Sequence, residues 1–153
     1  MERTLVLLKP DSIQRGLMGK IITRFEARGL KIVGMKMLKM GKELSKEHYS
    51  HLLGKPFYPD LEKFMTHHPI VAIVLEGKEC VQVVRDMMGP TNSRKALPGT
   101  IRGDFSMSTS RNIIHGSDST ETAEKEVKRF FKPEELHEYK FSGSDYAYAP
   151  DEQ

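Results

Sequence analysis

The sequence lacks the features that mark secreted, disulfide-rich and membrane proteins. It has a single cysteine, Cys80, so it can form neither an intrachain disulfide nor a cysteine-based zinc site. No stretch approaches the roughly 20 apolar residues that a membrane-spanning helix needs. The apolar run Leu5–Leu8 is too short for the core of a secretory signal and is followed at once by Lys9 and Pro10. We therefore expect a cytoplasmic protein.

Three common nucleotide and metal motifs are also missing. The sequence contains no G-x-x-x-x-G-K-[S/T] phosphate loop, no G-x-G-x-x-G dinucleotide fingerprint and no H-E-x-x-H zinc motif. His67 and His68 are adjacent, and adjacent side chains on a helix do not face each other. We therefore predict no metal site at this pair, and we expect His48, His51 and His137 to be ordinary surface histidines.

The composition is typical of a globular protein. Hydrophobic residues make up 38% of the 153 residues and charged residues 29%. This length predicts a single domain, residues 1–153, with a tail at residues 142–153 that either packs on a neighbouring subunit or is disordered. The net charge of +3 is too small to indicate a nucleic-acid partner by itself, although a local cluster of Arg and Lys would still favour a polyanionic ligand.

The pattern of apolar residues predicts strands alternating with helices. Short apolar runs predict four strands, at residues 3–8, 30–40, 70–75 and near 112–114. Helical spacing predicts three helices, at residues 19–28, 78–88 and 118–131. Asp118 and Glu121 form a capping box for the last of these helices. Ser45 is expected to cap a short helix that carries Tyr49, and Pro59 to start a helix that runs to about residue 67. This order predicts an α/β or α+β sandwich, with helices packed on one sheet.

The segment from residue 89 to residue 116 is where we expect function, because long loops in compact proteins are usually functional or disordered. His115 lies near its end, between a short apolar strand and a helix whose first N–H groups attract phosphate. Gly116 leaves room beside the imidazole, Ser117 offers a hydroxyl, and Glu126 lies where it can reach the ring. A nucleophilic histidine needs one ring nitrogen free and the other held by an acceptor. From spacing alone, His115 could equally be a polar histidine without a catalytic role.

Basic and aromatic residues supply further candidate contacts. Lys9 ends the first strand, Arg85 lies late in a helix and Arg102 lies in the loop; Arg guanidinium groups suit the oxygens of a phosphoryl group. Phe57 precedes a helix and could stack on a base. Taken singly, the cations are equally well explained as solvated surface charges, and Phe57 as packing for its loop. The hydroxyl and amide side chains that could add contacts are those of Thr91, Asn92 and Asn112.

Six segments resemble those of the nucleoside diphosphate kinases, in the order and at the spacing found in that family. The stretch Asn112–Ser119, N-I-I-H-G-S-D-S, resembles the family's active-site signature. The resemblance extends from Glu2 to about Leu136, so the sequence is identified as a member of this family. The other five segments are Leu8–Asp11, His48–Tyr49, Lys55–Phe57, Gly89–Asn92 and Pro98–Phe105.

The resemblance implies a fold and a role for each candidate residue. The fold would be α+β and ferredoxin-like, a four-stranded antiparallel sheet covered by helices. His115 would carry the phosphate, with Glu126 orienting its ring and Ser117 bonded in the same cluster. Tyr49 would steady the ring or the phosphate. The implied nucleotide contacts are Arg85, Thr91 and Arg102 to phosphates, Lys9 and Asn112 to sugar hydroxyls (Lys9 also near the transferred phosphate), and Phe57 and Leu61 to the base.

The resemblance also implies the reaction and its partners. A nucleoside triphosphate would phosphorylate His115 and leave as the diphosphate, and a second diphosphate would take the phosphate back at the same site, which gives ping-pong kinetics. Mg²⁺ would be held chiefly by phosphate oxygens, without a direct protein ligand. Stacking with little readout of base edges would accept many bases, ATP and GDP among them. The family forms homo-oligomers, generally hexamers and sometimes tetramers.

Four positions depart from the residues usual in the family. His51 replaces a commonly acidic residue, and Ser93 replaces a proline in the loop that packs between subunits. Thr109 and Ser110 replace an apolar residue and a glycine beside the base slot. These departures bear on base contact and on assembly, and none touches the chemistry of phosphate transfer.

Three other functions fit the sequence less well. A nucleotide sensor on the same fold would predict a broken set of site residues, whereas the set is complete here. A signalling protein of the histidine-phosphotransfer type would need a helical bundle, which the strand pattern argues against. A pI near 8.9 prompts a nucleic-acid-binding protein, but no basic run stands out, so nucleic acid is at most a secondary ligand.

Overall fold

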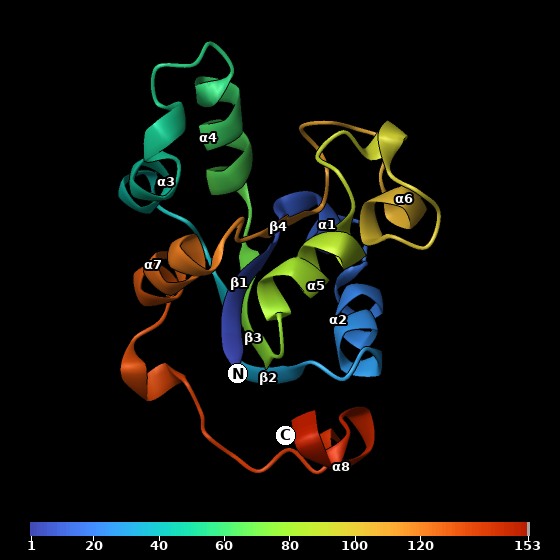
Figure 1. Cartoon of the computed structure of the whole chain (residues 1–153). Helices are drawn as coiled ribbons and strands as arrows, with labels where there is room; N and C mark the ends of the chain where they lie inside the picture. The colour runs from blue at the N-terminus through green and yellow to red at the C-terminus, as the bar shows by residue number, and fades with distance from the viewer. Residues whose placement is uncertain (153) are drawn as a thin grey trace.

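The computed structural model describes residues 1–152 and contains a four-stranded sheet with the strand order β2-β3-β1-β4 (Figure 1). The central strand β1 (Glu2–Leu8) pairs antiparallel with β3 (Ile70–Gly77) on one side and with β4 (Ile114–Gly116) on the other. The edge strand β2 (Lys31–Leu38) pairs antiparallel with β3. The four-stranded antiparallel sheet implied by the family resemblance is therefore confirmed.

Helices cover both faces of this sheet, and Figure 1 shows α2, α5 and α6 on one side with α3, α4 and α7 on the other. No helix within residues 1–152 combines the length and the apolar character needed to cross a membrane. The α-helices are α1 (Pro10–Gln14), α2 (Met18–Ala27), α3 (Lys42–His48), α4 (Tyr58–His67), α5 (Cys80–Met88), α6 (Ile101–Phe105), α7 (Thr120–Phe130) and α8 (Ser144–Ala147). Short 3-10 helices are η1 (Ser50–Leu52), η2 (Ser93–Lys95), η3 (Pro133–Glu135) and η4 (Pro150–Glu152).

The second half of the central strand, Leu5–Leu8, is apolar because both of its faces are covered. Leu5 and Leu7 point into a core that α4 and α7 close, while Val6 and Leu8 point into a second core that α2 and α5 close. All four side chains are fully buried, and each contributes about 1.5–3 kcal/mol of transfer free energy. The two cores fix the sheet between its helix layers, and β4 lies beside β1 within that frame.

Two predicted helix caps are wrong. The N-cap of α7 is Ser119, whose Oγ accepts a hydrogen bond from the Thr122 N–H at 3.1 Å, so Asp118 and Glu121 form no capping box. Ser45 caps nothing because α3 begins at Lys42, three residues earlier. Its buried hydroxyl lies 3.3 Å from the Tyr58 hydroxyl and joins α3 to α4 instead.

The segment from residue 89 to residue 116 has more regular structure than its composition predicts. It contains η2 and the five-residue helix α6, which the Thr100 hydroxyl caps by accepting from the Gly103 N–H at 3.0 Å. The strand predicted near 112–114 lies instead at Ile114–Gly116. Ile113 prevents the earlier start, because its φ of +62° lies outside the extended region.

The tail predicted at residues 142–153 is folded onto its own chain over its described part, and Gln153 lies outside the described residues. Helix α8 lies beneath the sheet in Figure 1. The Tyr148 hydroxyl accepts a hydrogen bond from the Lys78 N–H at 3.3 Å. Its oxygen also lies where a side chain at residue 77 would begin, so the close approach depends on Gly77. This contact joins the tail to the end of β3.

Candidate active site

His115 is the middle residue of β4, and the sheet determines which way its side chain points. It pairs with Leu7 of β1, and paired residues of neighbouring strands project from the same face. That face is the one covered by α7, which presents the buried Glu126 to the imidazole. The His115 side chain keeps 24% of its surface exposed, so one side is held and the other is open.

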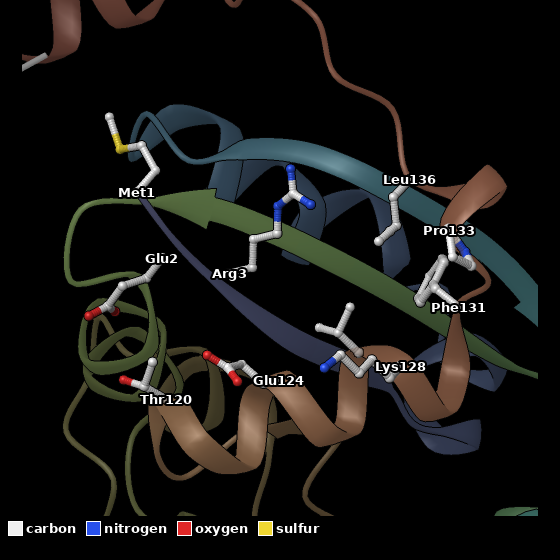
Figure 2. Close-up of a pocket in the computed structure, with 10 residues that line it drawn as sticks. Met1, Glu2, Arg3, Thr120, Glu124, Lys128, Phe131, Pro133 and Leu136 are labelled. Atoms are coloured by element: carbon white, nitrogen blue, oxygen red, sulfur yellow. The ribbon is translucent and has the colours of Figure 1, made fainter.

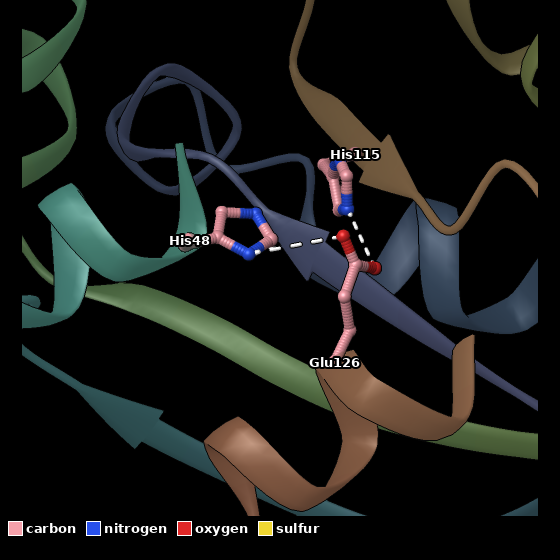
Figure 3. A group of neighbouring side chains, drawn as sticks. All are labelled: His48, His115 and Glu126. Carbon is pink, nitrogen blue, oxygen red and sulfur yellow. Dashed lines mark hydrogen bonds and ion pairs between the residues drawn. The ribbon is translucent and has the colours of Figure 1, made fainter. Parts of the chain in front are cut away.

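Glu126 holds one specific nitrogen of this ring (Figure 3). Its Oε2 lies 3.1 Å from His115 Nε2 and also accepts a hydrogen bond of 2.6 Å from the Ser117 hydroxyl. Burial alone would raise the pKa of Glu126, but the bonds from His115 and Ser117 outweigh it and lower the pKa to about 2. An ionised carboxylate can only accept, so the ring proton is on Nε2 and Nδ1 keeps a free lone pair.

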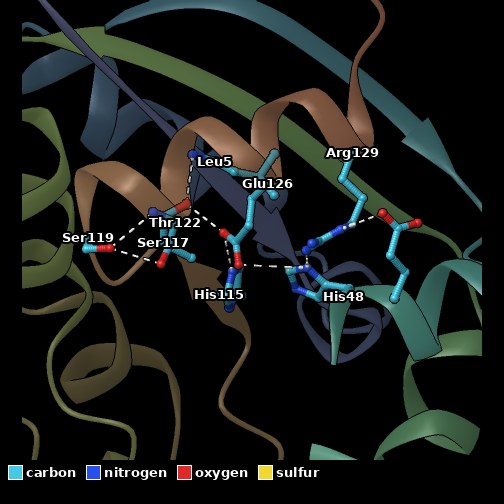
Figure 4. A network of polar contacts seen from close by, with 9 residues as sticks. Leu5, His48, His115, Ser117, Ser119, Thr122, Glu126 and Arg129 are labelled. Carbon is cyan, nitrogen blue, oxygen red and sulfur yellow. Dashed lines mark hydrogen bonds and ion pairs between the residues drawn. The ribbon is translucent and has the colours of Figure 1, made fainter. Parts of the chain in front are cut away.

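His48 lies against the same carboxylate, so the prediction that it is a surface histidine is wrong. It is only 4% exposed, and its Nδ1 is 3.8 Å from Glu126 Oε1 (Figure 3). Arg129 Nη1 donates to this Nδ1 at 3.3 Å (Figure 4), and Arg129 is in turn paired with Glu47. Burial, followed by the neighbouring charge of His115, lowers the pKa of His48 to about 3, so the ring is neutral. His51 and His137 are exposed, as predicted.

The predicted phosphate contacts gather in front of His115. Arg85, Thr91, Arg102 and His115 line one cavity of about 300 Å³. Asp118 lines it too and was not among the predicted residues. Two arginines against one aspartate give the lining a net positive charge beside the open side of the imidazole, which suits the binding of a polyphosphate.

Arg102 differs from the solvated loop cation considered above. It belongs to α6, is 6% exposed, and donates to the carbonyl oxygens of Gly89 at 2.8 Å and Ile114 at 2.7 Å. A weaker bond of 3.3 Å goes from its Nε to the Asn112 carbonyl. Burial and the charge of Arg85 lower its pKa to about 10, so it remains charged at neutral pH. Arg102 therefore ties β4 to the loop after α5 and keeps its remaining N–H donors for a ligand.

Lys9 and Asn112 are bonded to each other. Lys9 Nζ donates to Asn112 Oδ1 at 2.7 Å, and the Asn112 amide nitrogen donates to the carbonyls of Thr91 and Thr109. Burial and the charge of Arg102 lower the pKa of Lys9 to about 8. The pair thus joins the end of β1 to the loop that precedes β4, with both side chains fixed in orientation.

A second cavity, of about 500 Å³, adjoins the first, since Thr91 lines both. Phe57 and Leu61 form part of its wall, and Phe57 is 53% exposed, which argues against a mere packing role. Arg111 lies over the Phe64 ring at 3.8 Å and also lines this cavity. An open aromatic beside a slot of this size suits a flat heterocycle. The other predicted residues that line it are Lys9, Tyr49, Thr109, Ser110 and Asn112.

Tyr49 joins this slot to the histidine cluster. Its ring packs edge-on against His48 with centroids 4.6 Å apart, and it lines the 500 Å³ cavity. Its hydroxyl is buried without a hydrogen-bond partner within residues 1–152, and burial raises its pKa. A phenol in this state is a neutral donor available to an incoming acceptor.

The side-chain donors near His115 suit a divalent metal to different degrees. His48, His115 and Glu126 place ligand atoms within 4.8 Å of one another, but two imidazoles and one hydrogen-bonded carboxylate suit Mg²⁺ poorly. In the 300 Å³ cavity, Asp118 supplies the carboxylate among the lining side chains. One carboxylate fits Mg²⁺ only if phosphate oxygens supply most of its ligands.

A further cavity, of about 560 Å³, opens between the start of β1 and α7 (Figure 2). Arg3, Lys128, Phe131 and Leu136 are among its lining residues. It contains none of the predicted site residues. Of the ten predicted residues, eight, including His115, line the two cavities that share Thr91. The other two, Ser117 and Glu126, lie behind the imidazole.

Three of the residues that sequence reasoning missed carry side-chain chemistry at this site. His48 was missed because burial cannot be read from a lone histidine, although it stood in one of the recognised segments. Arg111 and Asp118 flank recognised residues within or next to the signature stretch, and their proximity to His115 was the available signal.

Comparison with known proteins points to one family. A family model described as nucleoside diphosphate kinase matches residues 2–136. A nucleoside diphosphate kinase of Rhodopirellula baltica is 52% identical over 152 residues, which are 99% of this chain and 100% of that protein. Another, from Carboxydothermus hydrogenoformans, is 53% identical over 139 residues, covering 91% of this chain and 93% of the relative.

The fold agrees with the same family. A halophilic nucleoside diphosphate kinase from Halobacterium salinarum, solved in complex with CDP, superposes with a TM-score of 0.95 at 43% sequence identity. The match covers 97% of this chain and 99% of that one. At this identity and coverage the likeness extends beyond the general fold to the family itself.

Proposed function

The chain belongs to the nucleoside diphosphate kinase family and is a nucleoside-diphosphate kinase, a phosphotransferase; from this premise we propose that His115 Nδ1 carries the phosphate. The observation behind the proposal is the contact of 3.1 Å between Glu126 and His115 Nε2. Because that contact holds the ring proton on Nε2, the lone pair of Nδ1 is available to attack. Ser117 supports the same geometry by bonding Glu126 at 2.6 Å.

In the proposed step, one bond to phosphorus forms as another breaks. The Nδ1 lone pair attacks the terminal phosphorus of a nucleoside triphosphate, an N–P bond forms, and the bond from that phosphorus to the bridging oxygen breaks. The nucleoside diphosphate leaves with the bridging oxygen. An incoming diphosphate then attacks the phosphohistidine with its own terminal oxygen, which restores the lone pair to Nδ1. Glu126 keeps the Nε2 proton in place throughout and stabilises the charge that develops on the ring.

The cations of the 300 Å³ cavity would act on the phosphates. Arg85 and Arg102 would neutralise charge as it moves from the transferred group to the bridging oxygen, and Thr91 would donate a hydrogen bond. Lys9 and Asn112 would contact the sugar hydroxyls, with Lys9 also near the transferred phosphate. Tyr49, whose hydroxyl has no other partner within residues 1–152, would donate to the phosphate or steady the ring.

Mg²⁺ would be held by the nucleotide's phosphate oxygens, with Asp118 the carboxylate that lines this cavity. When bound, it would supply positive charge that neutralises the polyphosphate. The base would lie in the 500 Å³ cavity between Phe57 and Leu61. Because stacking reads the face of a base rather than its edge, this arrangement favours acceptance of many nucleotides, ATP and GDP included.

We also propose that residues 1–153 form one domain and that the protein assembles as a cytoplasmic homo-oligomer, a hexamer or alternatively a tetramer. Apolar side chains exposed on the described chain support assembly. Met35 and Met37 on the edge strand β2 are 54% and 56% exposed, and Leu97 and Met107 beside α6 are 73% and 75% exposed. Such clusters of exposed apolar side chains typically mark interaction surfaces.

The carrier role can be tested by labelling. The protein is mixed with Mg²⁺ and ATP labelled on its terminal phosphate, without an acceptor, and unlabelled GDP is then added. We expect the label on the intact protein to survive alkali, to be lost in acid and to move to GTP after the chase. His115→Ala should take up no label, because no lone pair remains at that position.

The matched control is His51→Ala, which removes an exposed histidine outside both cavities and should leave labelling unchanged. Label on the His115→Ala protein, or an unlabelled wild-type protein that still binds ATP, would contradict the carrier role of His115.

A further inference from the structure

The backbone two residues before His115 is strained. Ile113 has a φ of +62°, a left-handed value that a β-branched residue rarely adopts. The Ile114 N–H donates to the Asn112 carbonyl at 2.8 Å, which closes a three-residue γ-turn centred on Ile113. Such a conformation costs free energy and persists only where the surrounding structure holds it in place.

The turn changes which side chains face which core. Ile114 pairs with Leu8 and His115 with Leu7, so Ile114 and His115 project from opposite faces of the sheet. In an uninterrupted strand, Ile113 would share the face of His115, because side chains alternate. Instead Ile113 and Ile114 are both fully buried in the core beneath α2 and α5.

This interruption of the alternation of side chains affects the candidate site. Strict alternation would also put Asn112 and His115, three residues apart, on opposite faces of the sheet. With the turn, Asn112 lines the 500 Å³ cavity beside Lys9 and His115 lines the adjoining 300 Å³ cavity. The strained residue therefore sets the relative position of two groups that would contact one nucleotide.

Both backbone polar groups of Ile113 are bonded to the segment that follows β1. The Ile113 N–H donates to Asp11 Oδ2 at 3.1 Å, and the Ile113 carbonyl accepts from the Lys9 N–H at 2.9 Å. Arg102 bonds the carbonyls on either side of Ile113, those of Asn112 and Ile114. Among these contacts, the bond to Asp11 is the one that a single side-chain change can remove without disturbing a proposed ligand contact.

Within residues 1–152 the Asp11 carboxylate makes no hydrogen bond other than the one to the Ile113 N–H. It lies in the first turn of α1, but α1 has no side-chain cap. Its Oδ1 is buried and has no hydrogen-bond partner within residues 1–152, so the carboxylate is committed to the turn through Oδ2 alone. The negative charge of Asp11 also partly opposes the lowering of the Lys9 pKa by burial and by Arg102. This gives Asp11 a rival role as a counter-charge to Lys9.

We propose that Asp11 is a positioning residue for phosphate transfer: its carboxylate holds the strained Ile113 turn and so fixes His115 relative to Asn112. The proposal rests on the carrier role of His115. Loss of the acceptor lets the turn relax toward an extended backbone, and small displacements of a reacting group cost up to about 100-fold in rate. Substrate binding, which draws on residues from several elements, is affected less.

The test compares two substitutions of nearly equal size. Asp11→Asn keeps an acceptor oxygen and removes the charge, while Asp11→Leu removes both. We expect Asp11→Leu to lower kcat by about 10- to 100-fold with a smaller change in KM, and Asp11→Asn to stay close to wild type. Hydrogen exchange of the Ile113 amide should accelerate in Asp11→Leu and not in Asp11→Asn. This readout reports the turn itself, so it separates failure of this proposal from failure of the carrier role.

A second pair of variants tests the strain directly. In an Ile113→Gly background the chain adopts φ +62° without a side-chain penalty, so adding Asp11→Leu should cost a smaller factor in kcat than it does beside Ile113. If Ile113→Gly does not fold, the comparison of Asp11→Asn with Asp11→Leu is sufficient to test the proposal. An unchanged kcat and an unchanged exchange rate in Asp11→Leu would overturn the proposal. So would equal losses in the Asn and Leu variants, since they would assign Asp11 the counter-charge role.

Discussion

At the scale of single residues, burial decides the charge of the histidine beside the proposed carrier. The pKa of His48 falls from its ordinary 6.5 to about 3 in the folded protein, chiefly through burial. Between these values the unfolded chain binds a proton that the folded chain excludes. The contribution of His48 to stability is therefore full above pH 6.5 and is lost as the pH falls toward 3. Glu126 adds a second loss of stability in acid: its pKa is lowered from 4.5 to about 2, so its contribution is lost as the pH falls from 4.5 toward 2.

His48→Gln should flatten the acid side of the stability curve. In the wild type the free energy of unfolding should fall by up to about 1.4 kcal/mol per pH unit from this group below pH 6.5. The variant lacks the group, so its curve should fall less steeply than that of the wild type between pH 6.5 and about 3. Above pH 4.5 the comparison is free of the titration of Glu126. Urea denaturation at half-unit pH steps measures the slope.

His51→Gln is the matched control for this measurement, because His51 is exposed. It should leave the pH dependence unchanged. Parallel curves for His48→Gln and the wild type would mean that the folded protein does not hold His48 neutral.

The sequence predicts neighbours within the candidate site where order along one helix decides their position, and fails to do so where tertiary packing decides it. Glu126 was placed near His115 from helical spacing, and the contact of 3.1 Å agrees. His48 could not be found that way, because α3 carries it to α7 across a long separation in sequence. The same limit applies to Arg102, whose carbonyl partners come from three different loop and strand positions.

At the scale of elements, the start of α7 is fixed by a single hydroxyl. Ser119 has an extended backbone, and its Oγ satisfies the Thr122 N–H at the open end of the helix. Ser119→Ala should destabilise the protein by about 0.5–2 kcal/mol, because that N–H loses its acceptor. Thermal or urea denaturation measures the change. Ser119→Asp, which keeps a capping oxygen, should recover most of it.

Asp118→Ala separates the two possible caps. If Ser119 is the cap, removing the Asp118 carboxylate should leave stability nearly unchanged, since it accepts no hydrogen bond from α7. A loss in Asp118→Ala that equals the loss in Ser119→Ala would support the capping box that the sequence pattern indicates.

The longer helices were predictable from sequence, whereas α6 and the exact position of β4 were not, for a physical reason. α2, α5 and α7 show enough turns for apolar periodicity to appear, and their observed bounds agree to within two residues of those expected. The five residues of α6 give little more than one turn, so no period can be read. β4 was displaced because a strained turn at Ile113, and not a change in composition, marks where extended backbone begins.

At the scale of the whole molecule, the sheet ends in an apolar edge. Met35 pairs with Ile73 and Met37 with Val71, and both partners belong to the core beneath α2 and α5. The apolar face thus continues from β3 onto β2, where the two methionines are more than half exposed. An edge strand with exposed apolar side chains is a natural surface for pairing with another copy.

Replacing both methionines should therefore weaken assembly without unfolding the subunit. Met35→Glu with Met37→Glu puts like charges on the surfaces that would meet, and burying such charges without partners is costly. We expect sedimentation to show smaller species, with the circular dichroism of the wild type retained. Leu53→Glu, at a residue 47% exposed on the connection between η1 and α4, is the matched control and should assemble normally. Wild-type mass in the double variant would exclude the β2 edge as the contact and direct attention to Leu97 and Met107 beside α6.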